Sequence, residues 1–205
     1  TVLMGVRDRH ALARACDLGV AMQLTNIARD IGEDALERRL YLPMAWMEDA
    51  GLEPEAFFDD PRPTKAIRQM TRRLVMQANR LYYRSESGIA ALPLSCRPGI
   101  YAARLIYAGI GRQVAEAGYD SISSRARTSK AAKIGWLAQS GLRAGVSAVT
   151  PRSATLYAPV LPECAFLVDA ACEGAPQRDR SDTLIEALAA LKQQDIRRNG
   201  ALIGR

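Results

Sequence analysis

The pattern of apolar and polar positions along the chain predicts a series of helices. Apolar side chains recur at every third or fourth position in residues 64–87, as on the buried face of an amphipathic helix. The members of this face are Ile67, Met70, Leu74, Ala78 and Leu81. Similar patterns predict four further helices, over residues 8–36, 44–50, 100–117 and 129–148.

Stretches rich in proline interrupt this pattern. Residues 53–63 carry several Pro and Asp residues and predict a connection between helices. Pro93 and Pro98 bracket a predicted turn before the helix over 100–117. Gly118 is expected to end that helix, because glycine readily takes the backbone conformation found after the last helical turn.

The chain changes character beyond residue 150, where prolines recur. Residues 174–182 predict a linker, and the spacing of Thr183 and Glu186 predicts the capped start of a final helix ending near residue 198. We therefore divide the chain into a helical part, residues 1–150, and a variable tail, residues 151–205, of which the last helix is interpreted as a packing element.

Oxygen-bearing side chains form a row on the first predicted helix. Each residue of a helix adds about 100°, which places Gln23, Asn26, Asp30 and Asp34 within a sector of about 80°. Arg29 is expected to point away from this sector. Upstream, the same sector holds Leu12, Cys16 and Gly19. This gradient predicts a pocket that takes hydrocarbon at its floor and an anion at its mouth.

The row has the chemistry of a site for a hard divalent cation. Mg²⁺ is usually held by one or two carboxylates while substrate phosphates complete its coordination. Asp30 and Asp34 repel each other at this spacing, and a bound cation would relieve that repulsion. We interpret Asp30 and Asp34 as metal ligands and Asn26 as a third. The alternative is an ordinary solvent-facing polar stripe.

Composition and charge narrow the class of protein. The chain has 205 residues, 48% of them hydrophobic, enough for one domain with a sizeable core. Aromatic residues make up only 6%, and Ala and Leu are abundant, which favours a mostly helical protein. The four cysteines show no Cys-x-x-Cys spacing, as expected for reduced thiols in a cytoplasmic protein. The first residue is Thr1, so the natural N-terminus is expected to lie upstream.

The net charge of +6 suits phosphorylated substrates, anionic lipid or nucleic acid. Zinc-finger spacing, an RNA-binding aromatic signature and a long basic run are all absent, so we expect no nucleic-acid partner. No apolar run reaches the roughly 20 residues that a membrane-spanning helix needs.

Residues 23–34 read Gln-Leu-Thr-Asn-Ile-Ala-Arg-Asp-Ile-Gly-Glu-Asp and are followed by Arg39-Leu-Tyr41-Leu-Pro43. This segment closely resembles the second aspartate-rich motif of the phytoene synthase and squalene synthase family, which joins two isoprenoid diphosphates head to head. The segment that begins Ala78-Asn-Arg-Leu-Tyr-Tyr83 resembles a downstream helix of the family. The resemblance runs from residue 1 to about 119, with a weaker continuation over 125–133, and leaves out the tail.

The resemblance implies an all-α fold, an isoprenoid-synthase-type helical bundle around a central cavity. It also implies Mg²⁺, with Mn²⁺ as an alternative ion, held by Asn26, Asp30 and Asp34. Gln23 and Arg29 would then lie near the diphosphate. For Arg29 the residues leave a second interpretation open, a surface ion pair with Glu33.

Three more residues match positions of the family. Tyr41 matches a tyrosine in the loop after the motif, where it would help to cover the diphosphate. Tyr107 matches a tyrosine of the active cavity, whose ring face would stabilise a carbocation, although a buried core tyrosine is the alternative. Arg125 matches one member of a basic pair, but Ser124 stands where the family usually has arginine.

The family holds its metal cluster with two aspartate-rich motifs on facing helices, and this sequence contains only the later one. We therefore expect the C-terminal part of a longer enzyme, with a bundle incomplete at its N-terminus and inactive by itself.

Within the family, the amino-acid sequence of the motif is closer to that of phytoene synthases than to that of squalene synthases. That likeness implies a prenyltransferase that condenses two geranylgeranyl diphosphates to phytoene in carotenoid biosynthesis. The alternatives are a synthase that makes squalene or dehydrosqualene from farnesyl diphosphate, and a non-catalytic assembly factor of the same fold. A basic helical nucleic-acid binder has only the net charge in its favour.

No Gly-x-Gly-x-x-Gly motif is present, so we expect no nicotinamide cofactor. Substrates with long hydrocarbon tails imply a peripheral encounter with a membrane.

Overall fold

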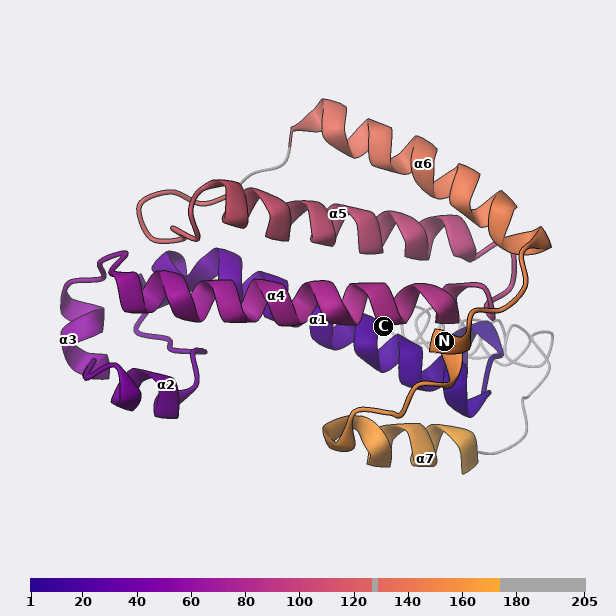
Figure 1. Cartoon of the computed structure of the whole chain (residues 1–205), viewed down its shortest axis with the longest axis horizontal. Helices are drawn as coiled ribbons and strands as arrows, with labels where there is room; N and C mark the ends of the chain where they lie inside the picture. The colour runs from indigo at the N-terminus through magenta and orange to yellow at the C-terminus, as the bar shows by residue number, and fades with distance from the viewer. Residues whose placement is uncertain (127–128, 174–205) are drawn as a thin grey trace, which may run out of the picture. The chain divides into compact units, whose positions relative to one another are not determined.

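A computed structural model describes residues 1–126 and 129–173 (Figure 1). The residues in those ranges form helices and no β-strand, so the predicted all-α class is confirmed. The helices are α1 (Arg9–Leu36), α2 (Met44–Asp49), α3 (Pro54–Asp59), α4 (Lys65–Ile89), α5 (Arg97–Glu116), α6 (Lys130–Val149) and α7 (Ala165–Glu173), with 3₁₀ turns at η1 (Val2–Met4), η2 (Ala154–Tyr157) and η3 (Pro162–Cys164). The predicted linker over 174–182 and the predicted helix over 183–198 lie outside the described residues.

Helix α1 runs close to its predicted bounds. Asp8 caps its start, because the side chain accepts a hydrogen bond from the backbone N–H of Ala11. The helix ends at Leu36, and Arg38 then adopts a positive φ of 54°, which turns the chain away from the helix axis. The whole predicted row therefore lies on one uninterrupted helix.

Helix α4 packs along α1 in the opposite direction (Figure 1). Its predicted apolar face is confirmed, since all five of its members are buried. At the far end of this contact Gly88 lies against Arg14, and the approach is so close that a side chain at Gly88 would overlap the Arg14 side chain. The backbones of the two helices can meet there only because glycine has no Cβ.

The connection predicted over 53–63 is partly wrong, because α3 forms within it. Pro54 occupies the first turn of α3, where the missing N–H would have no helical partner and the fixed φ suits the helix. The burial of Phe57 together with Met47 of α2 provides the stabilisation that the local sequence pattern did not reveal.

Helix α5 starts at Arg97, before its predicted first residue, and Pro98 is accommodated in its first turn. It ends just ahead of Gly118, which has a φ of 66°, as predicted. Helix α6 packs along α5. It begins and ends within one residue of its predicted bounds. At the centre of this contact the ring of Trp136 occupies the space where Gly109 lacks a side chain.

The segment that contains η2 returns to α1 and is held there by a buried ion pair. The guanidinium of Arg14, only 1% exposed, donates to the carbonyls of Thr155 at 2.8 Å and Ala158 at 3.0 Å. Asp17, fully buried, is ion-paired with Arg14 at 2.7 Å and accepts a hydrogen bond from Arg84 at 3.1 Å. Residues Thr1–Cys172 accordingly form one compact unit. The division of the chain at residue 150 stays a prediction.

In the ranges that the model describes, we find no helix with both the length and the hydropathy needed to cross a lipid bilayer.

The contact between α5 and α6 gives a stability prediction. Replacing Gly109 by Ala would drive a methyl group into the rigid Trp136 ring, so we expect the free energy of unfolding to fall by about 2 kcal/mol. Urea denaturation followed by circular dichroism measures this. Gly99→Ala is the matched control on the same helix, because nothing lies within 4 Å of the added carbon and helix propensity favours alanine by up to about 1 kcal/mol. Equal stability of the two variants would contradict the assigned packing of Trp136.

Candidate functional site

The four members of the predicted row lie on the second half of α1. Gln23 is exposed, whereas Asn26, Asp30 and Asp34 are half-buried. Successive carboxylates are one helical turn apart, as the periodicity required. The structure therefore supports the predicted alignment of these side chains on one side of the helix.

Two arginines hold the Asp30 carboxylate. Arg29 donates two hydrogen bonds, from Nε to Oδ1 at 2.7 Å and from Nη2 to Oδ2 at 2.6 Å. Arg125 donates a third, from Nε to Oδ1 at 3.0 Å. Burial alone would raise the pKa of the Asp30 carboxyl, but the hydrogen bonds and charges of Arg29 and Arg125 outweigh it and hold that pKa below its usual value. Asp30 is thus ionised and charge-neutralised.

This arrangement corrects two expectations about Arg29. On the helical wheel Arg29 lies off the row, but its side chain pairs with Asp30, so the row is not free of basic groups. The alternative prediction, an ion pair between Arg29 and Glu33, is also wrong, because Glu33 pairs with Arg125 at 3.3 Å instead.

The loop after α5 brings Arg125 to the site. Tyr119 has a φ of 60°, and the side chain of Asp120 then accepts from the backbone N–H groups of Ile122 and Ser123. Asp120 is also paired with Arg68 of α4 at 2.8 Å. The turn is therefore tied to the bundle just before the chain reaches Arg125.

Gly32 lets this loop approach α1. Its N–H donates to the carbonyl of Ser121 at 3.1 Å, and a Cβ at Gly32 would lie 2.9 Å from both that oxygen and the Cα of Ile122. Any larger residue at Gly32 would push the loop, and Arg125 with it, away from Asp30. The sequence analysis missed this role, although a glycine inside a strongly helical segment was a signal for close packing.

Asp34 differs electrostatically from Asp30. It forms no ion pair with any residue in the described part of the chain. Burial and the neighbouring charge of Asp30 raise the pKa of the Asp34 carboxyl, and Arg39 only partly offsets them. An added cation at this position would stabilise the ionised form of Asp34.

Asn26 provides an independent test of whether the row fits a metal ion. Its side-chain oxygen Oδ1 is buried and accepts no hydrogen bond from any described residue. A buried carbonyl oxygen without a donor is costly, and a cation is one partner that satisfies it. The oxygens of Asn26, Asp30 and Asp34 therefore fit a hard divalent ion in type and spacing.

The row supplies only part of a coordination sphere. Outside the undescribed residues, no three His, Cys, Asp or Glu side chains gather closely enough to hold a metal by themselves. Mg²⁺ typically keeps waters and takes phosphate oxygens in addition to protein carboxylates. The arrangement is thus suited to a metal that arrives with, or is completed by, an anionic ligand.

An apolar cavity of about 250 Å³ lies upstream of the row. On the α1 side it is lined by Ala15, Leu18, Gly19 and Met22, and α4 and α5 contribute further apolar side chains. Of the predicted upstream sector only Gly19 lines this cavity, because Leu12 and Cys16 pack in the cluster with Val168 of α7 instead. The prediction that these two residues form the floor of the pocket is therefore wrong.

The two tyrosines have different surroundings. Tyr107 of α5 is half-buried and packs against the cluster that contains Ala21, Ala78 and Tyr82, which places its ring beside the middle of α1. Tyr41, in the loop after α1, is 53% exposed and forms no hydrogen bond or ion pair with the row. The structure brings Tyr107 toward the site but gives Tyr41 no hydrogen bond with the row.

The sequence analysis also missed a buried residue pair that holds α1 against α4. Thr25 lies within the motif, and its hydroxyl forms a 2.8 Å hydrogen bond with the hydroxyl of Tyr82 on α4. Tyr82 also donates to the backbone carbonyl of Ala21 at 3.1 Å. These buried bonds fix the rotation of α1 about its axis, and hence the direction in which the row points.

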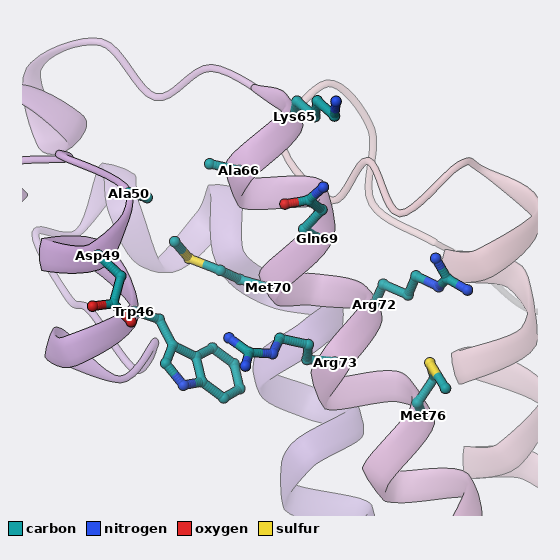
Figure 2. Close-up of a pocket in the computed structure, with 10 residues that line it drawn as sticks. All are labelled: Trp46, Asp49, Ala50, Lys65, Ala66, Gln69, Met70, Arg72, Arg73 and Met76. Atoms are coloured by element: carbon teal, nitrogen blue, oxygen red, sulfur yellow. The ribbon is translucent and has the colours of Figure 1, made fainter.

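A larger cavity lies on another face of the molecule (Figure 2). Its volume is about 780 Å³, and it lies between α2 and the exposed side of α4. Arg73 stacks over the ring of Trp46, with 4.5 Å between the guanidinium carbon and the ring centroid. None of the predicted site residues lines this groove, so its size does not identify it as the site.

Comparisons with known proteins agree with this geometry. The sequence model of the squalene/phytoene synthase family matches residues 1–132. The chain is 57% identical to a phytoene synthase of Cereibacter sphaeroides and 52% identical to one of Rhodobacter capsulatus, each over 194 residues and 95% of this chain. These alignments cover 55% and 57% of the two relatives, so the chain spans about half the length of the curated relatives that it matches.

A crystal structure of a dehydrosqualene synthase in complex with ligand shares the fold, with a TM-score of 0.57 and 27% sequence identity. The likeness covers 65% of this chain and 47% of that one. It confirms the predicted isoprenoid-synthase-type helical architecture.

The family model ends at residue 132, which confirms the predicted extent of the family resemblance. The alignment with the Cereibacter sphaeroides relative covers 194 of the 205 residues, so that relative shares much of the tail as well. The family match itself contains the row on α1, the cavity upstream of it, Tyr107 and Arg125. The chain therefore belongs to the squalene/phytoene synthase family.

Proposed function

We propose that the protein of this chain condenses two geranylgeranyl diphosphates head to head to form phytoene. The observation that carries the proposal is the row on α1, which joins metal-type oxygens and two guanidinium groups on the same helix that lines an apolar cavity upstream. The two bacterial relatives named as phytoene synthases support this substrate class.

The arginines are suited to receive the departing diphosphate. Arg29 and Arg125 direct their N–H groups at Asp30. A diphosphate offers oxygens of higher charge to the same donors, and guanidinium groups bind phosphates in a bidentate manner. Transfer of these donors from carboxylate to diphosphate would stabilise the charge that grows as the allylic C–O bond breaks.

The same transfer would release Asp30 to act as a metal ligand together with Asn26 and Asp34. A divalent ion held there supplies Lewis-acid assistance to the leaving diphosphate. Gln23 lies one turn before Asn26, in a position to hydrogen-bond the diphosphate.

The apolar side of the site would protect the carbocation. The cavity beside Gly19 and Met22 excludes water from the prenyl chain, which prevents capture of the cation by hydroxide or water. Tyr107, packed against the middle of α1, can present its ring face to positive charge. We give Tyr41 a role in covering the diphosphate only if its loop closes over the ligand.

The intact row distinguishes the main alternatives. A non-catalytic assembly factor has no need of a buried unpaired amide oxygen beside two carboxylates, so Asn26 favours an enzyme. A synthase of dehydrosqualene from the shorter farnesyl diphosphate remains the second candidate, because one such enzyme shares the fold. These 205 residues carry one aspartate-rich motif, and we propose that turnover needs the second from outside them.

Metal binding tests the role of Asp34. Replacing Asp34 by Asn keeps the shape but removes the charge, so we expect the affinity of the chain for Mn²⁺ in the presence of inorganic diphosphate to fall about 10-fold or more. Titration followed by Mn²⁺ paramagnetic resonance measures this. Asp49→Asn is the matched control, an exposed aspartate on α2 that should leave the affinity unchanged. Equal losses in both variants, or in neither, would remove Asp34 from the site.

The packing at Gly32 predicts a selective loss of activity. The assay uses a chimera in which the 205 residues replace the matching segment of the Cereibacter sphaeroides relative. Gly32→Ala displaces the loop that carries Arg125. We expect kcat to fall about 100-fold, because a small displacement of a catalytic group can lower the rate by that factor. Arg125→Lys should give a smaller loss, because its charge remains. Full activity of the Gly32→Ala chimera would show that the loop is not needed.

Product length tests the substrate. The same chimera is incubated with the C20 and C15 diphosphates separately, and the hydrocarbon is sized by mass spectrometry. We expect a C40 product from the C20 substrate and at least a 10-fold lower kcat/KM with the C15 substrate, since lost apolar contacts reduce transition-state binding. A preference for the C15 substrate would favour the dehydrosqualene alternative. The 205 residues alone should release no hydrocarbon from either substrate.

A further inference from the structure

The chain takes an unfavourable backbone conformation directly after α5. Gly118 has a φ of 66° and Tyr119 a φ of 60°, so two successive residues lie in the left-handed region. Glycine adopts this region freely, but a tyrosine does so only at a cost, because its Cβ comes too close to the following carbonyl oxygen. A conformation of this kind persists only where surrounding contacts hold it, and such places are frequent at functional sites.

Arg68 of α4 supplies these contacts with one guanidinium group. Its Nε donates to the carbonyl of Pro63 at 3.0 Å, and its Nη1 donates to the carbonyl of Gly118 at 2.9 Å. Its Nη2 donates to Oδ2 of Asp120 at 2.8 Å. The planar group thus joins the segment before α4 to the turn after α5, on both sides of Tyr119. A lysine ends in a single nitrogen and cannot reach three acceptors that are arranged around a guanidinium plane.

Asp120 extends this restraint toward Arg125. While Oδ2 pairs with Arg68, Oδ1 accepts hydrogen bonds from the backbone N–H groups of Ile122 at 3.1 Å and Ser123 at 2.9 Å. Burial would raise the pKa of the Asp120 carboxyl, but these N–H groups and the charge of Arg68 hold that pKa below its usual value. The carboxylate is therefore ionised, and its two oxygens connect the guanidinium of α4 to the backbone just before Arg125.

Arg125 needs this support, because its own contacts are weak. Its side chain is 38% exposed and, among the described residues, pairs only with Asp30 at 3.0 Å and Glu33 at 3.3 Å. Ion pairs of this exposure contribute little free energy once the cost of ordering two long side chains is counted. They cannot by themselves select one conformation of the loop. The position of Arg125 must therefore come mainly from the turn at Tyr119 and Asp120.

We propose that Arg68 and Asp120 are positioning residues, which fix the loop so that Arg125 reaches the Asp30 carboxylate. Neither forms a hydrogen bond or ion pair with the row in the ranges that the structure describes, so both would act through Arg125. Diphosphate as the ligand rests on the proposed function, whereas the positioning itself does not. The proposal therefore makes diphosphate affinity depend on an ion pair between α4 and the loop.

The first test uses the 205-residue chain without ligand. Nuclear magnetic resonance of the isotope-labelled chain gives the rate at which the Nε–H of Arg125 exchanges with water, and Arg125→Gln assigns the signal. The hydrogen bond to Asp30 slows this exchange. We expect Arg68→Lys and Asp120→Asn each to raise the rate about 5-fold, because both release the turn. Asp120→Asn keeps an oxygen for the backbone N–H groups and removes only the charge that holds Arg68.

The second test is a double-mutant cycle on the same chain. Isothermal titration calorimetry measures its affinity for inorganic diphosphate in the presence of Mg²⁺. We expect Arg68→Lys to lower this affinity about 5-fold in the unaltered chain and to leave it unchanged in the Arg125→Gln background. A merely structural role would give the same loss in both backgrounds. Arg62→Lys is the matched control, because Arg62 pairs with Asp60 at 2.6 Å in an exposed position and should affect neither measurement.

Circular dichroism and thermal unfolding establish that each variant is folded, and Asp120→Asn carries the test if Arg68→Lys is not. Unchanged exchange at Arg125 in the folded variants would overturn the proposal, and so would an equal loss of diphosphate affinity with and without Arg125. A different result would separate the two proposals. If Arg125→Gln left diphosphate affinity unchanged while the exchange rates rose as expected, the positioning would stand and the role of Arg125 in the proposed function would be wrong.

Discussion

The site depends on how the fold offsets two negative charges on one half-buried helix. Asp30 and Asp34 lie a single turn apart, where like charges repel and burial weakens solvation. The structure neutralises one of them with Arg29 and Arg125 and leaves the other without a basic partner in the described part of the chain. This asymmetry gives the site a cation-attracting end and a pair of guanidinium groups that an anion can recruit.

The rest of the bundle keeps α1 in the orientation that this arrangement needs. The close approach of α4 at Gly88 and the hydrogen bond between Thr25 and Tyr82 fix the helix along and about its axis. The buried Arg14 and Asp17 pair ties the returning segment to the same helix. Breaking such a pair leaves an unpaired buried charge, so this region is costly to rearrange. A rigid α1 can therefore present apolar side chains to one part of a ligand and oxygens to another.

The contacts of Asp30 also explain why metal and diphosphate would bind together under the proposed function. A metal alone must compete with two arginines for the carboxylate, and a diphosphate alone must draw those arginines away from it. Under the proposed function each would take the partner that the other releases, so the two affinities would be coupled. The same groups would then serve both binding and leaving-group stabilisation, as catalysis by preorganised charges requires.

The sequence by itself determined the row and every described α-helix except α3 and α7, because these features follow from the spacing of side chains along one helix, a local property. It also identified the family, through a contiguous motif. It did not reveal α3, whose stability comes from burial of Phe57 against a distant part of the chain. Only the tertiary structure decided that Arg125 reaches Asp30 and that Gly32 permits it. Those contacts join residues far apart in sequence, and their formation depends on backbone packing that no local pattern encodes.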